Sequence, residues 1–100
     1  MKYIEKPYIS DKIKNSRRVI RRFRMHRFLP GIYIIRTASG NDELEIIRAD
    51  FYRQKFIRKE DSYIVGFAAD YEDACEMVIM LTNKAIEKLG RPAIKEYLFQ

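Results

Sequence analysis

The chain has 100 residues, enough for one domain with a modest core, and its 47% hydrophobic and 34% charged content is typical of globular rather than disordered proteins. No apolar run reaches the roughly 18 residues that a transmembrane helix needs, and the first residues have no apolar secretory segment, so we expect no integral membrane association. The single cysteine excludes an intramolecular disulfide and favours a cytoplasmic location.

Positive charge is concentrated near the N-terminus. The net charge is +6; residues 1–29 hold ten Lys/Arg against two Asp/Glu, or +8, whereas residues 30–100 hold ten against twelve, or −2. A nearly neutral body with one cationic segment indicates an anionic partner. The alternative is that the body's own acids neutralise this segment within the fold. The acids considered for that role are Asp42, Glu43, Glu72, Asp73 and Glu76.

The first two predicted elements are an arm and a basic helix. Residues 1–9 contain Pro7, which argues against a helix, so we predict an arm that packs on the body or frays. Residues 10–28 are predicted to form the helix, with Ser10 as N-cap and Pro30 ending the element. Its apolar residues share one side and its cations lie opposite or on the border. The predicted nucleic-acid-binding residues are Lys14, Arg17, Arg18, Arg21, Arg22 and Arg24.

Residues 31–69 are predicted to form a three-stranded sheet. Residues 31–38 and 43–49 are rich in β-branched residues and are joined by a turn. Residues 62–69 form the third strand, and strict alternation puts Tyr63, Val65 and Phe67 on one face, with small residues on the other that allow a helix to approach.

Residues 50–60 are ambiguous between a helical turn followed by the start of a strand and a long hairpin arm. Aromatic and basic residues alternate there, so Tyr52 and Phe56 are candidates for stacking on nucleic-acid bases. The more ordinary interpretation is a strand with its apolar residues inside and its basic residues outside.

Residues 70–89 are predicted to form the longer helix, with Asp70 as N-cap and Gly90 after its end. Residues 91–100 form a tail that docks back on the body. The apolar arc of this helix is wider than one stripe, which indicates burial on more than one side. Either the basic helix covers the excess, or a second subunit does. The candidate interface residues are Met77, Ile79 and Met80.

The order α-β-β-β-α predicts a single α+β domain over residues 1–100, with a three-stranded antiparallel sheet and both helices on one face. The block YIVGFAADYEDACEMVIMLTNKAIEKLG, preceded by a basic helix and a PGIYII strand, resembles a small family of uncharacterised proteins from clostridial-type bacteria. The resemblance covers residues 17–98 and implies a fold without an activity. The element order also looks like that of a double-stranded-RNA-binding domain, but DYEDACE stands where such domains hold phosphates with lysines.

Enzymatic chemistry finds no support in the sequence. His26 is the only histidine, and there is no Walker, GxGxxG or GxSxG motif and no metal-ligand set, so we expect neither metal nor cofactor. The expected function is non-enzymatic binding of nucleic acid through the arginine-rich helix. The alternative is a protein-interaction or accessory module, homodimeric or with another protein partner, acting through the last helix. A membrane-surface role is less favoured, because the apolar face of the basic helix is small and the sheet needs it.

Overall fold

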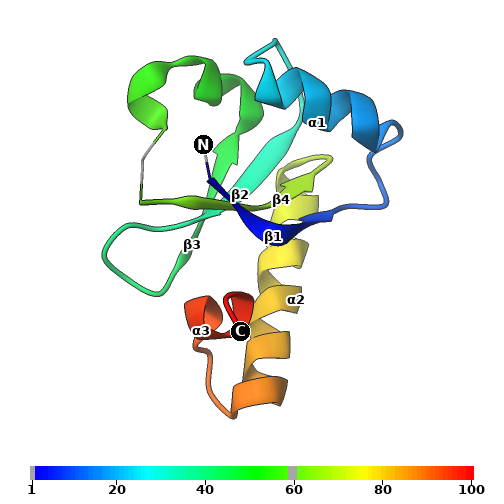
Figure 1. Ribbon diagram of the computed structural model, residues 1–100. Helices are drawn as coiled ribbons and strands as arrows, with labels where there is room; N and C mark the ends of the chain where they lie inside the picture. The colour runs from blue at the N-terminus through cyan, green and yellow to red at the C-terminus, as the bar shows by residue number, and fades with distance from the viewer. Residues whose placement is uncertain (1, 59–60) are drawn as a thin grey trace.

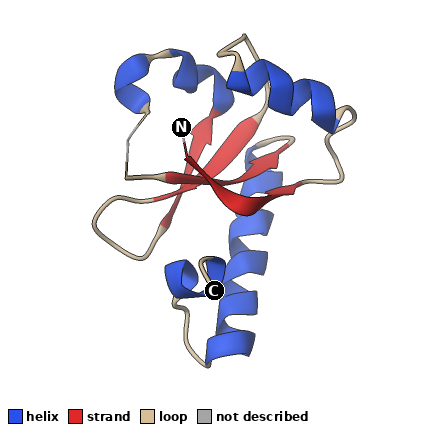
Figure 2. Cartoon of the chain, viewed as in Figure 1, coloured by secondary structure: helices blue, strands red, loops and turns tan. Residues whose placement is uncertain are grey.

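The computed structural model describes residues 2–58 and 61–100, and it confirms the α+β class. Its centre is a four-stranded sheet of order β1-β4-β2-β3 (Figures 1 and 2). The strands are β1 (Lys2–Ile9), β2 (Tyr33–Thr37), β3 (Leu44–Arg48) and β4 (Tyr63–Ala68). The helices are α1 (Ser16–Arg24), α2 (Tyr71–Leu89) and α3 (Ile94–Leu98), with 3-10 helices η1 (Ala49–Arg53) and η2 (Lys55–Ile57). The three strands predicted for residues 31–69 are confirmed, whereas the ambiguous residues 50–58 form two short helices and residues 59–60 lie outside the described chain.

The arm predicted at residues 1–9 does pack on the body, with Ile4 in the core, but it does so as β1, an edge strand that pairs in parallel with β4. Tyr3 pairs with Ile64 and Tyr8 with Gly66, so the register shifts in the segment that contains Pro7. An edge strand tolerates proline because one of its sides needs no ladder hydrogen bond. The sheet is therefore mixed and four-stranded rather than three-stranded and antiparallel.

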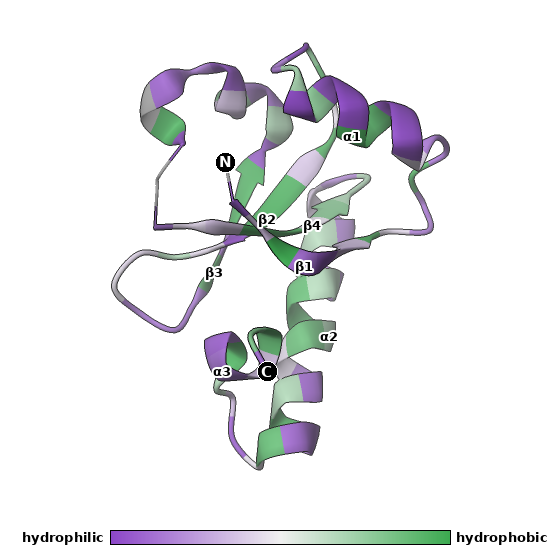
Figure 3. Cartoon of the chain, in the orientation of Figure 1, coloured by the Kyte–Doolittle hydropathy of each residue, from purple (hydrophilic) through white to green (hydrophobic). Residues whose placement is uncertain are grey.

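The helices cover both faces of the sheet, which corrects the prediction that they share one face. One core, under α1 and η1, contains Ile34, Ile64 and Phe67 from the strands. The other core, under α2, contains Ile35 and Val65. In Figure 1, α1 and the 3-10 helices lie above the sheet while α2 and α3 lie below it, and Figure 3 shows hydrophobic strands beneath a largely hydrophilic α1. The basic helix therefore cannot cover α2. With β1 first, the chain also departs from the α-β-β-β-α order on which the likeness to a double-stranded-RNA-binding domain rested.

Strand β4 departs from the predicted alternation. It carries Val65 as an extra residue opposite the β2 step Ile35–Arg36, which is a β-bulge. The bulge moves Phe67 to the face of Ile64, whereas alternation had placed it with Val65. One residue out of register reverses the face of every residue that follows, so this local feature decides which core Phe67 fills.

Gly66, next to the bulge, allows a close approach of α2 to the sheet, as the small residues of this strand predicted. A Cβ atom there would lie 2.7 Å from Met77 Sδ and 2.9 Å from the carbonyl oxygen of Tyr8. Met77 is only 7% exposed and belongs to the core, so its assignment to an interface is wrong. Asp70 accepts a hydrogen bond from Asp73 N at 2.7 Å and Gly90 is left-handed with φ 74°, which confirms both predicted ends of α2.

Candidate nucleic-acid interface

Helix α1 is shorter than predicted, with nine residues instead of the span 10–28. Its N-cap is Asn15, whose Oδ1 accepts a hydrogen bond from Arg18 N at 3.2 Å. Ser10 was the wrong N-cap, because its own N–H donates to the carbonyl oxygen of Phe67 at 3.0 Å and so continues the pairing of β1 with β4. Because the backbone of Ser10 is paired with the sheet, it is not part of the helix.

The helix ends in a Schellman motif at His26, before the predicted stop at Pro30. Arg27 N donates to Arg22 O at 2.9 Å and His26 N donates to Phe23 O at 3.0 Å, while His26 has φ 54°. This left-handed position is normally occupied by glycine, since a side chain is strained there. The turn reverses the chain, so that Phe28 and Leu29 return beside α1.

Replacing His26 with glycine is expected to raise the free energy of unfolding by about 1 kcal/mol at pH 7.5, since the left-handed strain is removed. Burial and the nearby charge of Arg58 lower the pKa of His26 below its ordinary value of 6.5. The unfolded chain therefore binds this proton more readily, and the wild-type protein should lose stability as the pH falls below about 6.5. Urea denaturation at pH 7.5 and 5.5 tests this. A stabilisation by His26→Gly that is no larger at pH 5.5 would contradict the titration of His26.

The structure brings the six predicted cations together on two flanks of α1 and the loop before it. Lys14, in the loop before α1, and Arg18 and Arg22 line one side of the helix. The other three surround Ile20 and Met25 on the opposite flank. All are exposed except Arg22, which is partly buried, and the Arg24 guanidinium lies 5.2 Å from the centre of the Tyr3 ring.

Neutralisation of these cations by the body's acids is not observed among the described residues. Asp42 accepts from the backbone N–H groups of Ile94 and Lys95, at the start of α3, and Asp73 accepts from Ala69 N. None of the ion pairs between described residues involves the six predicted cations. Those pairs are Lys12–Asp73, Lys12–Glu76, Arg36–Glu45 and Arg91–Glu96.

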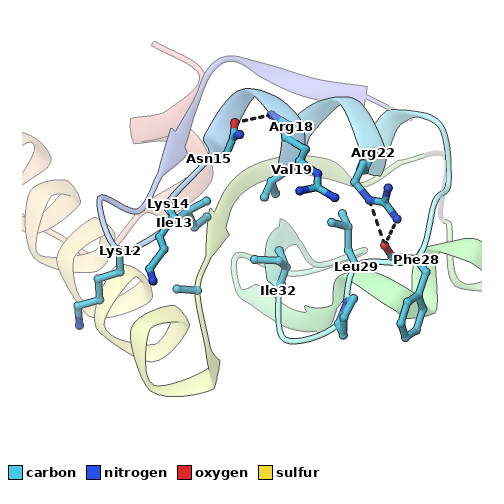
Figure 4. A pocket seen from close by; sticks show the side chains of 12 residues that line it. Lys12, Ile13, Lys14, Asn15, Arg18, Val19, Arg22, Phe28, Leu29 and Ile32 are labelled. Carbon is cyan, nitrogen blue, oxygen red and sulfur yellow. Dashed lines mark hydrogen bonds between the residues drawn. The ribbon is translucent and has the colours of Figure 1, made fainter.

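The first flank borders a groove of about 480 Å³ between α1 and the segment 28–32 (Figure 4). Apolar side chains from the loop, the helix and the returning segment line its inner wall, and Arg18 and Arg22 extend over them from α1. Both Nε and Nη2 of Arg22 donate to the carbonyl oxygen of Phe28, at 3.3 and 2.9 Å. The apolar residues of the wall are Ile13, Val19, Leu29, Pro30, Ile32 and Ala69.

The predicted stacking residues are not placed for stacking as far as the structure describes them. Tyr52 is 3% exposed and its hydroxyl accepts a hydrogen bond from Arg36 Nη1 at 3.0 Å, so it cannot stack on a base and that assignment is wrong. The side chain of Phe56 lies outside the described part of the structure. Of the predicted interface residues other than Met77, Ile79 is 60% exposed and Met80 packs partly against the core of α2.

Exposed aromatic residues beside the cations were missed by the sequence reasoning. Phe28 is 53% exposed and Phe51 is 41% exposed. The guanidinium of Arg53 lies 5.7 Å from the centre of the Phe28 ring, and that of Arg48 lies 5.4 Å from the centre of the Phe51 ring. In the sequence, the only indication for Phe28 was its position directly after the arginine-rich segment. The predicted helix over residues 10–28 included Phe28, so it was not considered as a separate exposed residue.

Protein-family models, curated proteins and solved structures yield no match to this chain. The resemblance to the clostridial family therefore stays a prediction. Of the described helices, none combines the length and hydropathy that a membrane-spanning segment requires. Within residues 2–58 and 61–100, no three His, Cys, Asp or Glu side chains are grouped as a metal site would need.

Proposed function

We propose that this protein is a non-enzymatic binder of nucleic acid that contacts phosphates through the cations of α1. The observation that carries the proposal is that the five arginines of α1 and Lys14 just before it form no ion pair with a described carboxylate. Unpaired guanidinium groups offer N–H donors in a planar fork that matches phosphate oxygens.

Two features of the fold support this proposal. The arginines of α1 are mounted on a packed layer, because Phe23 is 2% exposed and anchors the helix on the sheet. The backbone from which these side chains extend is therefore fixed before a ligand arrives, so binding does not have to order the helix. Residues 30–100 carry a net charge of −2, so the attraction for a polyanion is concentrated on the N-terminal part of the fold.

The test is the salt dependence of affinity. Fluorescence anisotropy with a labelled oligonucleotide should give a log–log slope of affinity against salt of roughly −4 for a duplex if four or five phosphates are contacted, and roughly −3 for a single strand. Released counterions produce this slope, so it reports phosphate contacts directly. An affinity that does not change between 50 and 200 mM salt would contradict the proposal.

A second candidate function, association through α2, is favoured by a specific observation. Tyr71, Ile79 and Ile86 are 58%, 60% and 43% exposed, and they are eight and seven residues apart, which puts them on one side of the helix. Because α1 covers the other face of the sheet, it does not cover these residues. Light scattering tests whether α2 forms a homodimer interface. A wild-type dimer that becomes monomeric in the Ile79→Glu variant would support it, and a wild-type monomer at high concentration would count against it.

A further inference from the structure

We infer that the groove beside α1 takes an unpaired nucleotide of a single strand, with its base against Phe28 and the neighbouring phosphate at Arg18 and Arg22. This inference rests on the proposed function and adds the form of nucleic acid that is bound. It combines three observations: the positive charge of the groove, the exposed ring of Phe28 at its rim, and the Arg22 guanidinium held by the Phe28 carbonyl.

The groove is suited to an anionic ligand with a flat apolar part. Its volume of about 480 Å³ falls in the range of small-molecule sites. Four of its lining side chains are cations, and none of its described lining residues is acidic; Lys12 is paired with Asp73 and Glu76, which leaves Lys14, Arg18 and Arg22 for a ligand. The inner wall is apolar, so a ligand that carried charge alone would leave this wall in water, whereas a nucleobase would cover part of it.

Phe28 supplies the stacking surface. Over half of its surface is exposed at 53%, and its backbone carbonyl is held by both Nε and Nη2 of Arg22. The guanidinium of Arg53 lies over the ring, 5.7 Å from its centre, so the other face of the ring is the one on which a base would stack. An aromatic ring next to arginines is the combination by which proteins hold unpaired bases without reading their sequence.

Arg22 is preorganised for a phosphate. Two of its five N–H donors bind the Phe28 carbonyl, which leaves three for a ligand and fixes the plane of the guanidinium. Arg18 lies one helical turn earlier on the same flank, a rise of about 6 Å, so the two guanidinium groups can hold one phosphate or two successive ones.

A single strand fits this groove better than a duplex. Bases in a duplex are stacked on one another and expose only their edges in the grooves, so a protein ring cannot reach their faces without unstacking them. The faces of unpaired bases are free. Phe28 and the apolar wall therefore contribute to binding only when the strand is unpaired, while the cations bind either form.

The experiment compares Phe28→Ala with wild type on a labelled 15-nucleotide oligothymidylate and a 15-base-pair duplex at two salt concentrations. Phe28→Ala should weaken binding of the single strand by about 5- to 150-fold, since a phenyl ring stacked on one base is removed. The salt slope and the duplex affinity should not change, because phosphate contacts remain. Phe28→Leu should resemble Phe28→Ala, whereas Phe28→Tyr should retain the affinity.

Phe99→Ala is the matched control, because Phe99 is a 49% exposed phenylalanine just after α3, on the side of the sheet opposite α1 (Figure 1). The inference would be overturned if wild type and Phe28→Ala bound the single strand equally well, or if wild type bound the duplex more tightly than the single strand. If the salt slope were steep in that case, the proposed function would still stand. Salt-independent or absent binding of both oligonucleotides would overturn both. Binding of polyglutamate or of anionic lipid vesicles as tightly as the single strand would assign the groove to another polyanion and also overturn the inference.

Discussion

Replacing Arg36 with methionine is expected to lower the free energy of unfolding by about 3 kcal/mol, a large part of the stability of a domain of this size. Arg36 is 3% exposed, and its guanidinium donates to Glu45 Oε1 at 2.9 Å, to the Tyr52 hydroxyl at 3.0 Å and to the carbonyl oxygen of Ile57. Methionine fills much of the volume but leaves these acceptors without their donor.

Urea denaturation of Arg36→Met, with Glu45→Gln as the control, measures this effect. The Glu45 side chain is 36% exposed, so water replaces part of its interaction and we expect a loss of no more than about 1 kcal/mol for that control. Arg36→Lys should be intermediate, because an ammonium keeps the charge but cannot bond three separate acceptors in the same fork. If Arg36→Met is as stable as wild type, these hydrogen bonds do not hold the η1–η2 segment on the sheet.

Changing Arg18 and Arg22 together to glutamine is expected to weaken single-strand or duplex binding by about 25- to 60-fold at 0.1 M salt, since two phosphate contacts and their released counterions are lost. The log–log salt slope should become less steep by roughly 1.5. Anisotropy titrations over a salt series measure both quantities on the same samples.

The control for net charge is Lys6→Gln with Lys88→Gln, which removes two positive charges near another groove between β1, α2 and α3. This pair should change the affinity far less, because its charges lie away from α1. An equal loss in both double variants would mean that the protein attracts polyanions through its total charge and that the flank of α1 has no special role. Circular dichroism should confirm that both variants are folded.

The elements with local causes could be predicted from the sequence. Asp70 and Gly90 bound α2 because an N-cap carboxylate and a left-handed glycine act within a few residues of the helix ends. Strands β2, β3 and β4 follow from short runs of β-branched and aromatic residues. The exposure of the cations also followed, since unpaired guanidinium groups lose more by leaving water than they gain by burial.

The rest of the site depended on contacts between distant residues. Tyr52 is buried because Arg36, from β2, meets its hydroxyl, and Phe28 is exposed because the turn at His26 brings it back beside α1. An exposed and a buried aromatic residue have the same local signature, so the two could not be told apart in the sequence.

The sequence by itself therefore determined strands β2, β3 and β4, helix α2 and the positive charge of the N-terminal part, because these properties depend on neighbours within a turn or a pleat. Only the tertiary structure decided that β1 joins the sheet beside β4, that the helices cover opposite faces, and that a groove opens between α1 and Phe28. Those features depend on pairing and packing between segments far apart in the chain, where the free energy gained by burying a shared surface outweighs local preference.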